Sequence, residues 1–157
     1  MTENMKRFKA IHVEGGSGAA AIDPNRVPTQ TFDWGAIKWF VSPDSVDGVG
    51  LTFGEVILLP GQGHARHNHP ESEEILYVLS GEGKQMLEHD GEEKWFPVKP
   101  GDTIYVETAQ FHSTVNGSWE PMRLLALYNP AGAEKALAGL PDFRQVEPGE
   151  LPGWTRA

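Results

Sequence analysis

The sequence has no cysteine, few basic residues and no long apolar run. Without cysteine the chain cannot form disulfides, thiolate metal sites or cysteine-held iron-sulfur clusters. The 13 Lys and Arg residues are outnumbered by 22 Asp and Glu residues, and the formal net charge is -9. Non-specific attraction to nucleic acid or to an anionic membrane is therefore not expected. No segment approaches the roughly 20 apolar residues that a helix needs to cross a bilayer.

The N-terminal residues are not expected to form a secretory signal. Lys6 and Arg7 are not followed by the apolar run of a secretory signal, so the expected location is the cytoplasm. The length of 157 residues predicts one domain with a sizeable core and leaves no room for a barrel plus a full second domain.

Glycine and proline, in contrast, are abundant. The 18 glycines and 12 prolines fall between short apolar runs, which is typical of an all-β protein with many tight turns. No stretch between these runs could hold a crossover helix, so the strands should form an antiparallel barrel or sandwich. The expected strands are 36–41, 50–59, 64–69, 74–79, 83–88, 92–96, 103–106, 112–115 and 122–128.

The predicted organisation has three parts. Residues 1–35 form an N-terminal arm, in which 9–14 could be one short strand, and residues 36–130 form the β-barrel. Residues 131–157 form a short helix, predicted at 131–140 from its Ala, Glu, Lys and Leu content, followed by an extended tail rich in proline.

Three histidines and one glutamate form the most informative pattern. Side chains alternate along a strand, so His67 and His69 should point to one spot inside the barrel. Glu74 begins the next strand, and His112 arrives from a later one. Imidazole nitrogen and carboxylate oxygen together suit one divalent Fe, Mn, Co, Ni, Cu or Zn ion, with at least two coordination positions left open.

Alternation also nominates the lining of the barrel. Gln85, Asn116 and Arg123 could line the cavity and orient a polar substrate or a ligand imidazole. His64 is out of phase with His67 and is expected to face away from the metal. The predicted apolar wall consists of Val56, Leu58, Leu76, Val78, Leu125 and Leu127.

These residues resemble the two motifs of the cupin superfamily. The first motif is matched at Gly61, His67, His69, Glu74 and Gly81. The second appears as Pro100-Gly101-Asp102 followed by His112 and Asn116. Glu73 would also satisfy the spacing from His69, but only Glu74 leaves six residues before Gly81. Gly61 and Gly81 are expected at turns that need a positive φ.

The resemblance implies a double-stranded β-helix barrel with His67, His69, Glu74 and His112 as metal ligands. It also implies a homodimer, and it places the chain among small single-domain cupins of the quercetin-dioxygenase-like type. The chain departs from the family at Glu107, which stands where a proline is usual. That departure could aim an extra carboxylate at the mouth of the barrel.

Three functions remain open on the sequence. The first is dioxygenase-like cleavage of a small oxygen-chelating substrate, favoured by a narrow margin because few basic residues could hold a sugar phosphate. The second is non-redox isomerase, decarboxylase or lyase chemistry, in which the metal polarises a carbonyl and Glu107 acts as base. The third is a non-catalytic cupin that binds a small molecule or a sugar.

Overall fold

The computed structural model describes residues 11–12 and 20–153. Its first pair of strands, β1 (Ile11–His12) and β2 (Ala20–Ala21), is antiparallel and separate from the barrel sheets. The strand expected at 9–14 therefore exists in part, and its other residues lie outside the described ranges. Within the described ranges, neither helix is long and apolar enough to cross a membrane.

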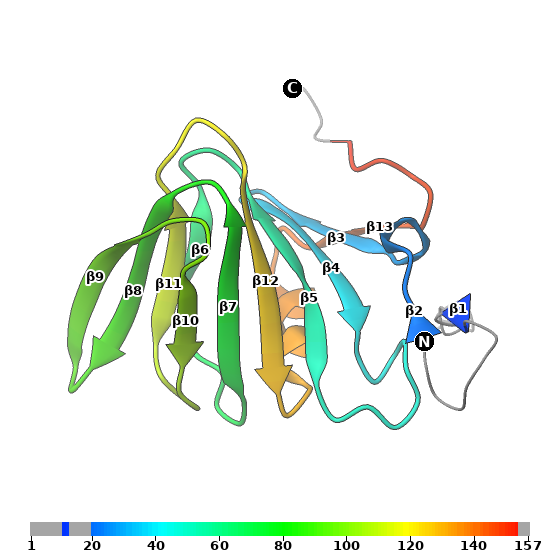
Figure 1. Ribbon diagram of the computed structural model, residues 1–157, viewed down its shortest axis with the longest axis horizontal. Coiled ribbons are helices and arrows are strands. Elements are labelled where there is room, and N and C mark those ends of the chain that lie inside the picture. Colours follow the sequence, from blue (N-terminus) through cyan, green and yellow to red (C-terminus); the bar gives the residue numbers. More distant parts are fainter. Residues whose placement is uncertain (1–10, 13–19, 154–157) are drawn as a thin grey trace.

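Two antiparallel sheets form the body of the molecule (Figure 1). The smaller sheet has the order β6 (Gly63–His67), β11 (His112–Asn116), β8 (Gly83–His89) and β9 (Glu92–Val98). The larger sheet has seven strands in the order β10 (Thr103–Val106), β7 (Glu73–Ser80), β12 (Met122–Asn129), β5 (Thr52–Leu58), β4 (Gly35–Val41), β3 (Thr29–Phe32) and β13 (Arg144–Val146). The predicted all-β antiparallel fold is confirmed.

The core lies against the inward face of the larger sheet. Val78 and Met122 are completely buried, and Leu58 and Leu124 are 1% exposed. Leu137 joins this cluster from the 3-10 helix η2 (Ala133–Gly139). The short helix predicted after residue 130 is therefore confirmed, and it packs on the barrel core.

Three strands of the described chain were missed by the sequence prediction, namely β2, β3 and β13. β3 lies in the predicted arm and pairs with β4, while β13 lies in the predicted tail and pairs with β3. A further short 3-10 helix, η1 (Pro24–Arg26), precedes β3. β13 has a single apolar residue and lies at the end of the sheet. β3 is only four residues long, and although Thr29, Thr31 and Phe32 are buried they form no long apolar run in the sequence.

The side chains of β12 that point into the core are not the ones that were predicted. Leu124 and Ala126 point into the core, whereas Leu125 and Leu127 are half-buried on the outer face. Arg123 also points outward, where its guanidinium pairs with Glu55. The run from Leu124 to Tyr128 is apolar at every position, so its alternation could not tell the inward from the outward face.

The expected turn glycines are confirmed. Gly61 and Gly81 have φ values of 72° and 82°. At Gly81 a side chain would also collide, because a Cβ there would lie 2.8 Å from the Cα of Met122. These turns fix the ends of the strands that carry the histidines and Glu74.

Candidate metal centre

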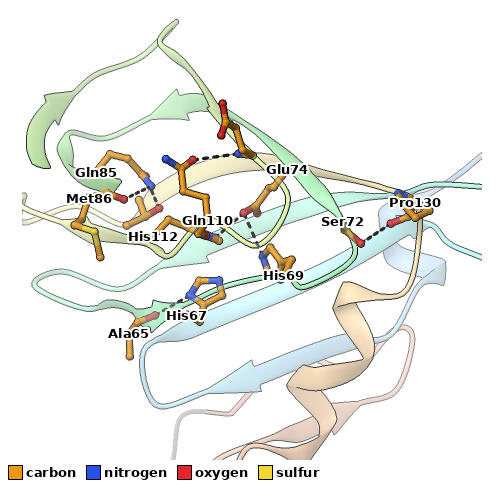
Figure 2. Close-up of polar contacts among 12 residues, drawn as sticks. Ala65, His67, His69, Ser72, Glu74, Gln85, Met86, Gln110, His112 and Pro130 are labelled. Atoms are coloured by element: carbon orange, nitrogen blue, oxygen red, sulfur yellow. Dashed lines mark hydrogen bonds and ion pairs between the residues drawn. The ribbon is translucent and has the colours of Figure 1, made fainter. Parts of the chain in front are cut away.

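The four predicted ligands meet inside the barrel (Figure 2). One ligand atom from each of His67, His69, Glu74 and His112 lies within 4.8 Å of the others. His67 ends β6 and is the cross-strand partner of His112, the first residue of β11. Glu74 comes from β7 in the opposite sheet. The site therefore joins the two sheets.

His69 is delivered by a loop, because β6 ends at His67. The backbone N–H of Ala109 donates to the carbonyl oxygen of His69 at 2.9 Å, and the Asn68 side chain donates to the carbonyl oxygen of Ala109 at 3.1 Å. These two bonds hold the His69 loop against the turn before β11. The position of His69 depends on that turn as much as on strand alternation.

His64 lies beside the cluster, so the prediction that it faces away was wrong. Ala65 and Arg66 on β6 oppose the single residue Ser113 on β11, which makes a β-bulge between His64 and His67. The extra residue resets the alternation and turns both imidazoles inward. Their ring centroids are 3.8 Å apart, and the His64 ring also stacks on Trp34 at 5.1 Å.

Backbone carbonyls set the tautomers of two histidines. Nδ1 of His67 lies 2.7 Å from the carbonyl oxygen of Ala65, and Nδ1 of His112 lies 2.9 Å from that of Gln110. A carbonyl oxygen only accepts, so Nδ1 carries the proton in each ring. The Nε2 lone pairs then point into the site, which is the arrangement of a metal-binding imidazole.

The inward atoms have no ordinary hydrogen-bond partners. Nε2 of His69, Nε2 of His112 and Oε2 of Glu74 are buried without one, although the Glu74 oxygen lies 3.3 Å from His69 Nε2 and 2.9 Å from His112 Nε2. A lone pair facing a carboxylate is repulsive unless a proton or a metal ion lies between them. Ligands that share an ion with bonds of about 2.1 Å are separated by roughly 3 to 4.2 Å, so this donor set fits a divalent transition metal.

The surroundings favour the metal-binding protonation states. Burial lowers the pKa of His67 to about 2, and the neighbouring His64 and His112 rings lower it further. Burial alone would raise the pKa of Glu74, but hydrogen bonds from His112 and His69, which form when Nε2 carries a proton, outweigh burial and lower that pKa to about 2. At neutral pH His67 is neutral and Glu74 is ionised, as ligands of a cation must be.

A cavity of about 40 Å³ adjoins the cluster. It has room for about three water molecules. Among the described residues that line it there is no Lys or Arg. Its walls comprise Trp34, Ile37, Val56, Leu58, His64, His67, Glu74, Leu76, His112, Thr114, Leu124, Tyr128 and Leu137.

The four other predicted site residues all lie outside this lining, and two of them are at the surface. Glu107 lies in the exposed turn between β10 and β11, where its backbone N–H donates to the side chain of Gln110 at 3.1 Å. Arg123 is on the outer face of the larger sheet, as described above. Neither side chain touches the cavity as the prediction required.

Gln85 and Asn116 are both fully buried but serve the framework. Gln85 accepts a hydrogen bond from Thr114 at 2.7 Å, so it lies one residue behind the cavity wall. The Asn116 amide donates to the carbonyl oxygens of Leu58 and Glu120, which ties β11 to the chain on both sides. Asn116 thus stabilises the barrel end.

Sequence reasoning missed Trp34 and Tyr128 as well as His64. Tyr128 is 5% exposed, and its ring centroid lies 4.7 Å from that of His69. Side chains alternate along β12, so the inward position of Tyr128 could have been predicted once Arg123 was known to point outward. No sequence signal marks Trp34, since it lies in the turn between β3 and β4.

Comparisons with known proteins agree with this architecture. Residues 54–128 match the family model described as a cupin domain. A glucose-6-phosphate isomerase of Thermococcus gammatolerans is 38% identical over 93 residues, covering 53% of this chain and 48% of the relative. An uncharacterised protein of Methanocaldococcus jannaschii is 33% identical over 103 residues, covering 66% of this chain and 79% of the relative. The chain spans about half the length of the isomerases that it matches.

Solved structures show the same fold. A variant of the oxalate decarboxylase of Bacillus subtilis superposes with a TM-score of 0.69 and 16% identity, covering 85% of this chain and 34% of that chain. At this identity the likeness concerns the arrangement of strands only.

Proposed function

This chain belongs to the cupin superfamily, and we propose that it is a metal-dependent enzyme that moves a proton within a small hydroxy-carbonyl compound without redox chemistry. The observation that carries the proposal is the set of unpartnered inward atoms on His69, Glu74 and His112, next to a cavity that has no cationic side chain. Similarity to isomerases over half their length supports the reaction class.

The four clustered side chains would hold one divalent ion. A bound ion would supply a Lewis acid that polarises a carbonyl oxygen and steadies negative charge on it. The carbonyl oxygens of Ala65 and Gln110 keep the His67 and His112 rings oriented before any ion binds. This pre-organisation lowers the cost of assembling the site.

The chain's own residues restrict what can bind. Leu58, Leu76 and Leu124 form apolar walls that exclude bulk water and strengthen interactions with the ligand's polar end. The cavity suits a ligand of a few heavy atoms rather than a flavonol. This size argument favours isomerisation over the dioxygenase reaction, which the sequence analysis preferred by a narrow margin.

The charges of the site argue against a phosphorylated substrate. Neither the cavity nor the adjacent surface groove beside His69 is lined by Lys or Arg, and that groove includes Glu71. A phosphate group would therefore lose its hydration without gaining a cationic partner. We expect an uncharged hydroxy-carbonyl substrate, in contrast to the sugar phosphate named for the relatives.

The test is an isomerisation assay on matched pairs of compounds. Protein loaded with Mn, Fe, Co, Ni, Cu or Zn is incubated with glyceraldehyde or dihydroxyacetone and, separately, with their phosphates, and products are followed by proton NMR. We expect interconversion of the unphosphorylated pair with at least one metal. His67→Ala should abolish it together with metal binding.

The control for that variant is His89→Ala. His89 is an exposed histidine at the end of β8 beside Asp90, so its loss should change neither metal content nor turnover. An oxygen electrode run in parallel tests the dioxygenase alternative. Oxygen consumption without isomerisation would replace the proposal, and tight binding of these compounds without turnover would favour the non-catalytic cupin.

A further inference from the structure

Two rows of side chains cross the inward face of the smaller sheet beside the metal cavity. In the first row, His112 on β11 is the cross-strand partner of His67 on β6. In the second row, Thr114 on β11 pairs with His64 on β6 and with Gln85 on β8. Residues two apart on a strand point to the same face and are separated by roughly 7 Å. The second row therefore lies one step along the sheet from the clustered histidines.

Thr114 brings a hydroxyl group to the wall of the cavity. It belongs to the same lining as His67, Glu74 and His112, and it is 7% exposed. Its side chain carries the only aliphatic hydroxyl among the described residues of that lining. A ligand held by the cluster would therefore meet this group on the β11 side of the cavity.

Gln85 determines the direction in which the Thr114 hydroxyl donates. Nε2 of Gln85 donates to the carbonyl oxygen of Met86 at 3.1 Å, which leaves Oε1 as the acceptor of the amide (Figure 2). The Thr114 hydroxyl donates to that Oε1 at 2.7 Å. A hydroxyl group has one proton and two lone pairs. Because its proton is already used, the Thr114 oxygen can only accept from any further partner.

The protein does not fill the lone pairs of this oxygen. Among the described residues, no N–H or O–H group donates to Oγ1 of Thr114, whose one hydrogen bond is the one to Gln85. That bond is not needed to join β11 to β8, because the backbones of the two strands already pair. A buried hydroxyl oxygen at a cavity wall is normally completed by a donor from the cavity, either water or a ligand.

We propose that Thr114 is a specificity-determining residue that accepts a hydrogen bond from a hydroxyl group of the ligand held at the metal centre. The inference rests on the proposed function and narrows its substrate class. The preferred compound carries a free hydroxyl next to the group that binds the ion. A compound with hydrogen or fluorine in place of that hydroxyl cannot donate, and it leaves the Thr114 oxygen desolvated without a partner.

Binding of three hydroxamates tests this role without turnover. Hydroxamates chelate a metal ion through two oxygens, so the rest of the molecule is left to contact the cavity wall. Glycolohydroxamate carries a hydroxyl where acetohydroxamate has hydrogen and 2-fluoroacetohydroxamate has fluorine. Titration calorimetry of the metal-loaded protein gives the affinity for each compound. Comparing wild type with a variant cancels the intrinsic metal affinity of each hydroxamate.

The informative variant is Thr114→Val, which replaces the hydroxyl with a methyl group. The preference for glycolohydroxamate over acetohydroxamate should be about 2- to 10-fold greater in wild type than in Thr114→Val, as expected for one hydrogen bond. The same excess should appear against the fluorine compound. Thr114→Ser retains a hydroxyl and should keep most of the preference. Thr103→Val, at an exposed threonine on β10, is the matched control and should behave as wild type.

A double variant separates recognition from folding. Thr114→Val leaves Oε1 of Gln85 buried without a donor, so its thermal midpoint should fall. Adding Gln85→Leu removes that orphaned acceptor and should recover part of the midpoint, while the preference for the hydroxyl compound stays lost. Equal preferences in wild type and Thr114→Val would overturn the proposal. So would a wild type that binds none of the three compounds, or a double variant that regains the preference.

The same proteins separate this inference from the proposed function. If wild type prefers glycolohydroxamate through Thr114 but isomerises neither glyceraldehyde nor dihydroxyacetone, the isomerase proposal fails and the role of Thr114 stands. If wild type isomerises these compounds while Thr114→Val keeps the full preference for the hydroxyl compound, the role of Thr114 fails and the isomerase proposal stands.

Discussion

The backbone N–H of Ala109 donates to the carbonyl oxygen of His69 at 2.9 Å, and Ala109 makes this bond from a left-handed conformation with φ of 64°. A side chain with a Cβ adopts that conformation at a cost of about 1 to 2 kcal/mol. Local backbone strain thus accompanies the contact that positions one of the four clustered side chains.

Ala109→Gly should relieve this strain. Glycine adopts a positive φ readily, although it gives up more entropy on folding, so the expected net gain is about 0.5 to 1 kcal/mol in the free energy of unfolding. Ala109→Val should lose at least as much, because a β-branched residue tolerates this region poorly. Urea unfolding of the three metal-free proteins measures both changes. Equal stability of the glycine and valine variants would contradict the assigned conformation.

Removal of metal should destabilise the protein, and Glu74→Gln should uncouple stability from metal. A ligand at 100 times its dissociation constant adds about 2.7 kcal/mol to the free energy of unfolding. Without metal, the Glu74 carboxylate faces the Nε2 lone pair of His112 at 2.9 Å. A glutamine amide could donate to that nitrogen instead. Metal-free Glu74→Gln should therefore be at least as stable as metal-free wild type, yet gain nothing when metal is added.

Glu73→Gln is the matched control for that experiment. Glu73 lies on the outer face, where its carboxylate accepts hydrogen bonds from Tyr105 at 2.7 Å and Asn129 at 2.9 Å. Thermal melts with and without added metal should show the wild-type response in Glu73→Gln. If the metal response survives in Glu74→Gln and vanishes in Glu73→Gln, the metal ligand is Glu73 and the assignment to Glu74 is wrong.

The metal-free protein should lose stability in acid through its buried histidines. Burial lowers the pKa of His64 to about 4 and that of His67 to about 2, whereas an unfolded histidine titrates near 6.5. The folded-state pKa values are the lower ones, so the unfolded chain binds more protons in acid. The two buried neutral histidines make their full contribution to the free energy of unfolding above pH 6.5. That contribution falls as the pH drops, until about pH 4 for His64 and about pH 2 for His67.

His64→Gln isolates one of these contributions. Between pH 6.5 and 4, the free energy of unfolding of wild type should change more steeply than that of His64→Gln, by up to about 1.4 kcal/mol per pH unit. Urea titrations of metal-free protein across this range measure the two slopes. Parallel slopes would mean that His64 is accessible to protons in the folded state.

The sequence predicted the composition of the cluster better than its surroundings. His67, His69, Glu74 and His112 could be found because their spacing reflects the chemistry of a shared ion. His64 could not, because a β-bulge between His64 and His67 is a property of strand pairing with β11. The partner strand is far away in the sequence, so local alternation carried no sign of the bulge.

The sheet edges and the orientation of β12 escaped prediction for similar reasons. β13 pairs with β3 and has only one apolar residue, so its own sequence carries little sign of a strand. In β12 every residue from Leu124 to Tyr128 is apolar, which hid the phase of that part of the strand. Turn glycines such as Gly61 and Gly81 were predictable because a positive φ is a local requirement.

The phase of β12 can be checked by paired truncations. Leu124 is 1% exposed in the core, so Leu124→Ala should cost about 2 to 5 kcal/mol. Leu125 is half-buried on the outer face, and Leu125→Ala should cost less than half as much. Urea unfolding compares the two directly. A larger loss of unfolding free energy in Leu125→Ala than in Leu124→Ala would mean that Leu125 faces the core, as the sequence predicted.

A homodimer remains a prediction, and the outer face of the larger sheet is where it should be tested. Ile75, Tyr77 and Leu79 on β7 are each 40% exposed, and Tyr105 on the neighbouring β10 is 52% exposed. Large apolar side chains gathered on one sheet face favour association with a second surface. Tyr77→Glu should therefore shift the protein to monomer in light scattering at micromolar concentration. Trp119→Glu is the control, because Trp119 is 96% exposed in the loop after β11 and apart from this face. A wild-type monomer would refute the dimer, and a dimer unaffected by Tyr77→Glu would move the interface elsewhere.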